Sequence, residues 1–264
     1  MNPRAPQKSA RYVTRMCVRM HESDPKGWLR TESLLDYFQD AASEHAEKLG
    51  AGVTDLMKLN LTWVLSRYHI RIIRYPIWRE SLKLITWPSL NFGLFALREF
   101  EIRDKNGEIL AAATSSWMLI DLETKRPVPP AERFGRYPMD QSRAIPSDFE
   151  PLPALRDADY EKPFEVRMRD LDWNRHVNHV SYIAWCLETA SPDFRERLRP
   201  SEIEADFRGQ AFLGDHVVCR VRKVSISKTP VCAYQVIKSE NGKELARLRI
   251  AWRVGSLSAT ERLI

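Results

Sequence analysis

The residues with the clearest capacity for chemistry lie in one segment, 170–179, directly before an apolar helical pattern. Polar side chains alternate along it at Asp172, Asn174, His176 and Asn178. A carboxylate can take a proton from water or attack a carbonyl directly, while an amide and an imidazole can donate hydrogen bonds that orient it. Asn178 is suited to cap the helix, whose first backbone N–H groups favour developing negative charge nearby. The spacing therefore indicates acid–base or nucleophilic chemistry centred on Asp172.

Two less specific interpretations of this segment compete with catalysis. An Asp-x-Asn sequence before a helix is often only turn and capping chemistry. His176 and His179 could join Asp172 in a metal site, but no further ligand is evident, so we expect no metal and no cofactor. The sequence also lacks a glycine-rich phosphate loop, a G-x-S-x-G elbow and a cysteine–histidine pair of sensible spacing.

An internal repeat bears on this choice. Segment 18–42 aligns without a gap on segment 166–190, and Asn106-Gly107 matches Asn241-Gly242 farther along each half. Two similar halves joined by the proline-rich stretch 127–153 are the economical interpretation.

The two halves differ in their polar residues at the loop before the helix. The first half keeps the aspartate, as Asp24, but has Lys26 and Trp28 where the second half has its amide and its imidazole. Because only the second half retains carboxylate, amide and imidazole together, the comparison favours a chemical role over plain turn formation.

Each half is expected to contain a short strand, a loop, a long helix and then four strands, which is an α+β architecture. The first helix is predicted to be capped at Thr31 and to bury Leu34, Leu35, Phe38, Ala42 and His45. The second is predicted to follow Asn178 and to bury Val180, Ile183, Ala184 and Leu187. The predicted strands are 15–20, 62–74, 81–88, 93–103 and 109–120, then 164–168, 203–211, 215–225, 231–239 and 244–254. The two Asn-Gly pairs predict tight hairpins.

Composition limits the class of protein. The 264 residues are 44% hydrophobic and 29% charged, as in an ordinary globular chain. Apolar stretches such as 109–113 and 117–120 are far shorter than the roughly 20 residues that span a bilayer. The start of the sequence shows no secretory signal, so we expect a cytoplasmic protein.

Charge limits the kinds of binding partner, and cysteine spacing indicates the state of the thiols. A formal net charge of +6 can attract an acidic partner, but the basic residues are scattered and no nucleic-acid-binding motif is present. The cysteines at 17, 186, 219 and 232 lie far apart, which favours reduced, buried thiols over disulfides or a zinc site.

Beyond these patterns, the sequence resembles the acyl-acyl carrier protein thioesterases, whose chains are two fused hot-dog domains. The segment Asp172-x-Asn174-x-His176-x-Asn178, followed by Tyr182, Trp185 and Glu188, is similar to the family's catalytic stretch. Family-like pieces of the first half are 34–42 with His45 and Gly50, 63–67, 75–78, 86–87, 115–117 and 126–127. The resemblance runs from about Val13 to Trp252.

The resemblance implies a tandem hot-dog fold in which each half is a long helix packed across an antiparallel sheet. The domains expected are a basic N-terminal arm at 1–12, an N-terminal hot-dog domain at 13–130, a linker at 131–160 and a C-terminal hot-dog domain at 161–264 that carries the catalytic loop. It also implies an apolar acyl tunnel lined largely by the first half.

The activity implied is hydrolysis of fatty acyl-acyl carrier protein thioesters to free fatty acid and carrier protein, which ends chain elongation. Asp172, Asn174 and His176 are the catalytic residues expected, supported by Asn178 and Gln210. The partner expected is an acyl carrier protein bearing a phosphopantetheine-linked acyl chain, with no nucleic acid and no membrane span; a homodimer of the chain stays open.

One departure from the family pattern leaves alternatives open. The family has a carboxylate beside a cysteine in the strand after the second helix, where this chain has Gln210 and Ala211. An amide can orient a ligand but cannot act as a base, which leaves Asp172 as the acid–base or nucleophilic group. The alternatives are an acyl-CoA thioesterase and a non-catalytic acyl-binding or regulatory hot-dog protein.

Overall fold

The structure is a computed structural model that describes residues 9–134, 138–225 and 229–255. Most of the expected N-terminal arm, residues 1–8, lies outside the described residues. The first half contains β1 (Tyr12–Cys17), the short 3-10 helix η1 (Met20–Glu22), α1 (Thr31–Leu49), α2 (Val53–Lys58), β2 (Leu61–Ile72), β3 (Ser81–Phe92), β4 (Phe95–Arg103), β5 (Ile109–Asp121), β6 (Pro127–Val128) and α3 (Pro130–Phe134). The second half contains β7 (Tyr160–Glu165), η2 (Met168–Asp170), α4 (His179–Thr189), α5 (Pro192–Arg197), β8 (Leu198–Phe207), β9 (His216–Ser225), β10 (Val231–Lys238) and β11 (Glu244–Val254).

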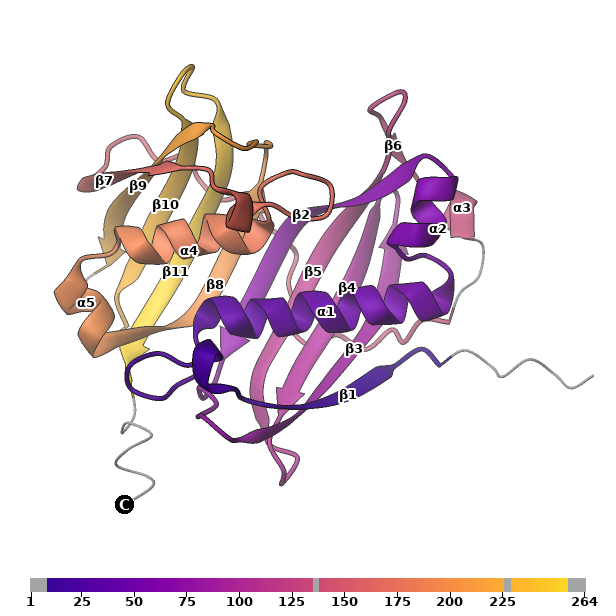
Figure 1. Ribbon diagram of the computed structural model, residues 1–264, viewed down its shortest axis with the longest axis horizontal. Helices are drawn as coiled ribbons and strands as arrows, with labels where there is room; N and C mark the ends of the chain where they lie inside the picture. The colour runs from indigo at the N-terminus through magenta and orange to yellow at the C-terminus, as the bar shows by residue number, and fades with distance from the viewer. Residues whose placement is uncertain (1–8, 135–137, 226–228, 256–264) are drawn as a thin grey trace, which may run out of the picture.

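The strands form one antiparallel sheet in the order β1-β3-β4-β5-β2-β8-β11-β10-β9-β7, with β6 paired to β5. The order is symmetric about the β2–β8 seam, where residues 67–71 pair with residues 202–206. Both long helices, α1 and α4, lie on the same face of this sheet and contact each other (Figure 1). The α+β architecture predicted from the repeat, a long helix across an antiparallel sheet in each half, is therefore confirmed.

Helix α1 packs through the face that its apolar periodicity predicted. Leu34, Leu35 and Phe38 are fully buried against the sheet, and Ala42 and His45 are buried with them. Burying each of the three large side chains is worth about 1.5–3 kcal/mol. The predicted cap at Thr31 is wrong: the cap position is Arg30, and the Thr31 hydroxyl lies 3.0 Å from that of Tyr75.

Helix α4 begins as predicted. The Asn178 side chain accepts a hydrogen bond from the Val180 backbone N–H at 3.1 Å, so this cap is confirmed. Ile183 is fully buried and Val180 and Leu187 are buried, whereas Ala184 is half-buried. With 11 residues the helix is shorter than α1, and its burial rather than its length stabilises it.

The predicted strands after each helix are present, and both Asn-Gly pairs lie in hairpin turns, with φ of 90° at Gly107 and 68° at Gly242. The strand predicted at 203–211 differs, because β8 ends at Phe207. The chain leaves the sheet at Gly209, where a Cβ atom would lie 3.0 Å from the Glu244 carbonyl oxygen. This close approach favours glycine over any residue with a Cβ atom. Gln210, the next residue, lies in a loop rather than in a strand.

The first strand of each half ends earlier than predicted. β1 covers 12–17 rather than 15–20, and β7 covers 160–165 rather than 164–168. The residues that follow turn into the 3-10 helices η1 and η2, which feed the loops before α1 and α4.

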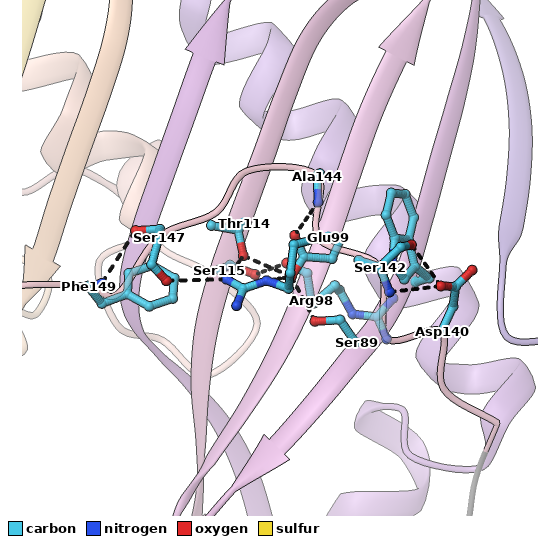
Figure 2. A network of polar contacts seen from close by, with 12 residues as sticks. Ser89, Arg98, Glu99, Thr114, Ser115, Asp140, Ser142, Ala144, Ser147 and Phe149 are labelled. Atoms are coloured by element: carbon cyan, nitrogen blue, oxygen red, sulfur yellow. Dashed lines mark hydrogen bonds and ion pairs between the residues drawn. The ribbon is translucent and has the colours of Figure 1, made fainter.

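The segment between the halves crosses the sheet on the face away from the helices (Figure 2). Phe100 of β4 packs on Phe38 of α1, so its neighbour Glu99 points to the opposite face. The fully buried Glu99 carboxylate accepts hydrogen bonds from Arg143 Nε at 2.9 Å and from the Ala144 N–H at 3.0 Å. The hydroxyls of Ser89 and Thr114 donate to it as well. This buried ion pair fixes the connecting segment to the first half.

Four free cysteines are present, as predicted. Cys186, Cys219 and Cys232 are buried, but Cys17 is exposed on β1, an edge strand, so the prediction of a buried thiol is wrong there. No helix among the described residues combines the length and the apolar character that crossing a membrane requires.

Candidate active site

The loop between η2 and α4 is a compact turn built around Asp172. Its Oδ1 atom accepts hydrogen bonds from the backbone N–H groups of Asn174 at 2.8 Å and His176 at 3.1 Å. The Asp172 N–H donates to the His176 carbonyl at 2.7 Å, and the Arg175 N–H donates to the Asp172 carbonyl at 3.0 Å. Four local hydrogen bonds therefore fix the backbone and one carboxylate oxygen of Asp172.

The loop before α1 has the same hydrogen bonds around Asp24. Asp24 Oδ1 accepts from the N–H groups of Lys26 at 2.8 Å and Trp28 at 3.0 Å. The Asp24 N–H donates to the Trp28 carbonyl at 2.7 Å, and the Gly27 N–H donates to the Asp24 carbonyl at 2.9 Å. Turn formation is thus a property that both aspartates share, and it does not by itself distinguish a site for chemistry.

The two loops differ at the second carboxylate oxygen. Asp24 Oδ2 forms an ion pair with Arg199 Nη2 at 2.5 Å, and the Arg199 guanidinium lies 4.9 Å from the centre of the Trp28 ring. Asp172 Oδ2 has no hydrogen-bond or ion-pair partner within the described parts of the chain. Because the Asp172 side chain is half-buried, desolvation raises its pKa above the ordinary value, against the lowering effect of the two N–H groups on Oδ1.

The other two predicted catalytic residues contact Asp172 through their backbone. His176 is half-buried, its backbone N–H donates to the carboxylate, and its ring lies edge-on to that of Phe212 with centroids 5.1 Å apart. Asn174 lies at the tip of the turn with its side chain exposed, so its contact with Asp172 is made by the backbone.

Gln210 lies beside this loop, but not in the strand predicted for it. Its neighbour Ala211 accepts a hydrogen bond from the Val177 N–H at 3.0 Å, which joins loop 208–215 to the Asp172 loop. The Gln210 side chain is exposed, and it forms no hydrogen bond with the residues that the structure describes. The Ala211 N–H donates to the Tyr182 hydroxyl at 3.1 Å. Tyr182 is a buried core residue, and its role in holding this loop is not evident in the sequence.

The start of α4 offers fewer free donors than its sequence suggests. The Asn178 N–H donates to the Asp170 carbonyl at 2.8 Å, and the Val180 N–H donates to the Asn178 side chain. The His179 N–H forms no hydrogen bond with the described residues, which leaves it as an available donor at the start of α4.

His179 connects the loop to the first half. Its ring lies 5.8 Å from that of Tyr68 on β2 and 6.0 Å from that of Phe207 on β8, measured between centroids. Tyr68 in turn contacts Phe100, which packs on Phe38 of α1. Burial lowers the pKa of His179 to about 4, so its imidazole is neutral at neutral pH. The sequence offered no signal for this aromatic row, because its members are far apart in the chain.

A cavity of about 480 Å³ lies at the opposite end of α4, between Thr189, Phe194 and Tyr234. It belongs to the second half and does not include the Asp172 loop. Within the described ranges, no cluster of three or more histidine, cysteine, aspartate or glutamate side chains could hold a metal ion.

Sequence comparison identifies the family. Residues 9–134 match the sequence model described as the acyl-ACP thioesterase N-terminal domain, and residues 154–254 match that of the C-terminal domain. A dodecanoyl-[acyl-carrier-protein] hydrolase of Umbellularia californica is 29% identical over 252 residues, which are 89% of this chain and 66% of the relative. Oleoyl-acyl carrier protein thioesterase 1 of Arabidopsis thaliana is 28% identical over 228 residues, which are 78% of this chain and 62% of the relative. The chain therefore spans less than two thirds of the length of these chloroplastic plant relatives.

Solved structures show the same fold. The 12:0-ACP thioesterase from Umbellularia californica matches with a TM-score of 0.82 at 25% identity, covering 94% of this chain and 95% of that one. An acyl-ACP thioesterase from Bacteroides thetaiotaomicron matches with a TM-score of 0.82 at 24% identity, covering 92% and 98%. Matches along nearly the whole of both chains confirm the predicted tandem hot-dog fold.

Proposed function

Because the chain belongs to the acyl-ACP thioesterase family, we propose that it hydrolyses fatty acyl-acyl carrier protein thioesters to free fatty acid and carrier protein, which ends chain elongation. One observation carries the proposal more than any other. Asp172 has one oxygen fixed by two N–H groups and the other without a partner among the residues that the structure describes, whereas Arg199 neutralises the same oxygen of Asp24.

Asp172 supplies the base or the nucleophile in this proposal. As a base, its Oδ2 takes a proton from a water molecule while the water oxygen bonds to the thioester carbonyl carbon. The negative charge that forms on the carbonyl oxygen is stabilised by the His179 N–H and by the positive end of the α4 dipole. When the carbon–sulfur bond breaks, the proton passes from Asp172 to the thiolate. As a nucleophile, Oδ2 attacks the carbonyl carbon itself, the carbon–sulfur bond breaks and the carrier leaves as its thiolate. Water then hydrolyses the mixed anhydride to the free fatty acid and the Asp172 carboxylate, and the proton released in this step balances the thiolate.

The remaining predicted residues have supporting roles. His176 donates a hydrogen bond to the substrate or orients the carboxylate, Asn174 acts chiefly through its backbone N–H, and Asn178 caps α4. Gln210, next to the Ala211 carbonyl that holds the loop, is an orienting amide and not a base.

The acyl chain lies in the first half in this proposal. The aromatic row from His179 through Tyr68 and Phe100 to Phe38 runs from the start of α4 to the packed interface between α1 and the sheet. An apolar route of this kind suits an acyl chain whose thioester stops at the loop.

Two alternatives keep specific support. Acyl-CoA hydrolysis uses the same chemistry on another carrier, and a non-catalytic acyl-binding protein is favoured by Gln210 at the position of the family's second carboxylate. Thiol release should be measured with the same acyl chain on acyl carrier protein and on CoA. The proposal expects the higher kcat/KM on the carrier protein, and a higher value on CoA contradicts it.

Replacement of Asp172 tests the chemistry. Asp172→Ala should lower the rate of thiol release by at least about a hundredfold, the usual scale for one general base. Equal, slow release by wild type and variant, with acyl chains still bound, favours the non-catalytic alternative. Gln210→Glu is a second probe: a large increase in rate shows that the natural amide reduces catalysis.

A further inference from the structure

An exposed tryptophan lies at the tip of the Asp172 loop. The Trp173 side chain is 81% exposed, and Met168 in the preceding 3-10 helix is 71% exposed. Large apolar side chains with so much exposed surface, close to a candidate active site, are typical of surfaces that a partner covers. Phe212 and Leu213, in the loop joined to this one through the Ala211 carbonyl, are exposed as well.

Three arginines lie close to Met168 and Trp173 in the chain. Arg167, Arg169 and Arg175 are all exposed, and none forms an ion pair with the residues that the structure describes. Glu165, Asp170 and Asp172, the carboxylates nearest in the chain, form no ion pair with a described residue, and Asp170 accepts from the Arg167 backbone N–H at 2.8 Å. We call the residues Arg167, Met168, Arg169, Trp173 and Arg175 the arginine–tryptophan face.

The matching positions of the first half lack most of this face. They carry Pro25 and Gly27 in place of the tryptophan and the third arginine, and His21 in place of the second. Nearby cations of that half are engaged: Arg19 lies 3.5 Å from Glu22, and Lys26 donates to the Glu196 carbonyl at 2.7 Å. The apolar tip and its free arginines are thus specific to the loop that carries Asp172.

Arg175 has a backbone conformation that disfavours its own side chain. Its φ is 62°, in the left-handed region that suits glycine, and the first half has Gly27 there with φ of 77°. An arginine at such a position has no local structural reason, which points to a function for its side chain.

We propose that the arginine–tryptophan face docks the acyl carrier protein. This inference rests on the proposed function and adds the surface through which the carrier presents its acyl arm. The partner has the chemistry that this face fits: an acidic protein surface with a small apolar patch, whose carboxylates meet the three guanidinium groups and whose apolar side chains cover Trp173 and Met168. Docking here brings the arm to the thioester site, because Trp173 directly follows Asp172 in the chain.

The test compares one acyl chain on two thioesters, the acyl carrier protein and carrier-free pantetheine. Arg169→Glu with Arg175→Glu should lower kcat/KM for the carrier-protein substrate by at least about tenfold, and Trp173→Ala by about five- to tenfold. Both should leave kcat/KM for acyl-pantetheine within about twofold, since that substrate lacks the protein surface. Increasing salt should lower wild-type kcat/KM on the carrier protein and have less effect on the double variant.

Two control variants match these changes. Lys105→Glu with Lys243→Glu alters net charge equally at the exposed Asn-Gly hairpins, and Met20→Ala removes the exposed first-half counterpart of Met168. Both controls should retain wild-type kinetics on both substrates. Equal losses on both substrates in the face variants, or a loss in the charge control as large as in Arg169→Glu with Arg175→Glu, overturn the proposal.

Direct binding separates this proposal from the proposed function. Carrier protein loaded with a non-hydrolysable acyl group should bind the Asp172→Ala enzyme, and the face variants should weaken that binding by about tenfold. If wild type hydrolyses neither substrate but the face variants weaken binding, the proposed function fails and the docking surface stands. If the face variants instead change the sedimentation of the protein from dimer to monomer with carrier binding intact, the face joins two copies of the chain and the proposal is wrong.

Discussion

The two aspartate loops have the same backbone and different surroundings. Asp24 and Asp172 each hold a turn through one carboxylate oxygen, with hydrogen bonds that agree in partner and closely in length. In the first half Arg199 forms an ion pair with the second oxygen of Asp24 and packs on Trp28. Because Arg199 belongs to the second half, these contacts tie the two halves together. In the second half the corresponding oxygen of Asp172 forms no hydrogen bond or ion pair with the residues that the structure describes. The same turn motif is thus a candidate active site only in the second half, where no arginine pairs with the aspartate among the described residues.

The largest effect is expected when His176 is replaced by the tryptophan that the first half has at the matching position. His176→Trp should lower kcat by about a hundredfold, because it removes a hydrogen-bonding group and fills the site. The measurement is thiol release at saturating substrate. A variant as active as wild type would show that the imidazole has no part in the reaction.

The reciprocal change tests the first loop as a structural element. Trp28→His should create no second active site and should lower the free energy of unfolding by about 2–4 kcal/mol, since Trp28 is buried. Denaturant unfolding measures this loss, and kcat per folded molecule should stay at the wild-type value. An increase in kcat would contradict the assignment of this loop to structure.

Removing Arg199, which pairs with Asp24 in the first loop, should lower the free energy of unfolding somewhat less than Trp28→His does. Arg199→Ala leaves Asp24 with an unpaired, mostly buried oxygen and should reduce stability by about 1–3 kcal/mol, below the cost for a fully buried pair because both side chains keep some contact with water. In a double-mutant cycle, Asp24→Asn should recover part of the loss. Strictly additive losses would mean that the ion pair contributes nothing.

The pH dependence of the reaction reports on the open carboxylate. The ionised form of Asp172 is the active one, and burial raises its pKa, so activity is present above that pKa and is lost as the pH falls through it. The profile of kcat against pH should therefore fall about tenfold per pH unit on its acid side, with a midpoint above 3.8, the ordinary aspartate value. A profile that stays flat down to that value would argue against Asp172 as the base.

The smallest expected effect concerns the left-handed residue that the two loops share. Arg175→Gly gives the second loop the glycine of the first and should raise the free energy of unfolding by about 0.5–1 kcal/mol. Gly27→Ala, the matched change in the first loop, should lower it by a similar amount. Thermal or denaturant unfolding at one pH measures both, and a loss of stability in Arg175→Gly would show that the arginine has a structural role.

Local patterns in the sequence predicted a large part of this protein. The repeat, the apolar face of α1, the Asn178 cap and both Asn-Gly hairpins follow from short-range spacing, and all are present. The choice of the Asp172 loop came from comparing the two halves, and the catalytic roles of its residues stay predictions. The failures have long-range causes: the Thr31 hydroxyl pairs with the distant Tyr75 instead of capping α1, and the chain leaves the sheet before Gln210, where Gly209 packs on the distant Glu244.

Contacts between residues far apart in the chain were decided by the tertiary structure alone. Sequence separation hides the pairing of Arg199 with Asp24, the tie between Ala211 and Tyr182, and the contact of His179 with Tyr68. Each forms only when the β2–β8 seam joins the halves or when α4 packs on its sheet, because a side chain's partner depends on where the chain returns in space. The aspartate turns are thus a property of the sequence, and the fold determines which turn stays open.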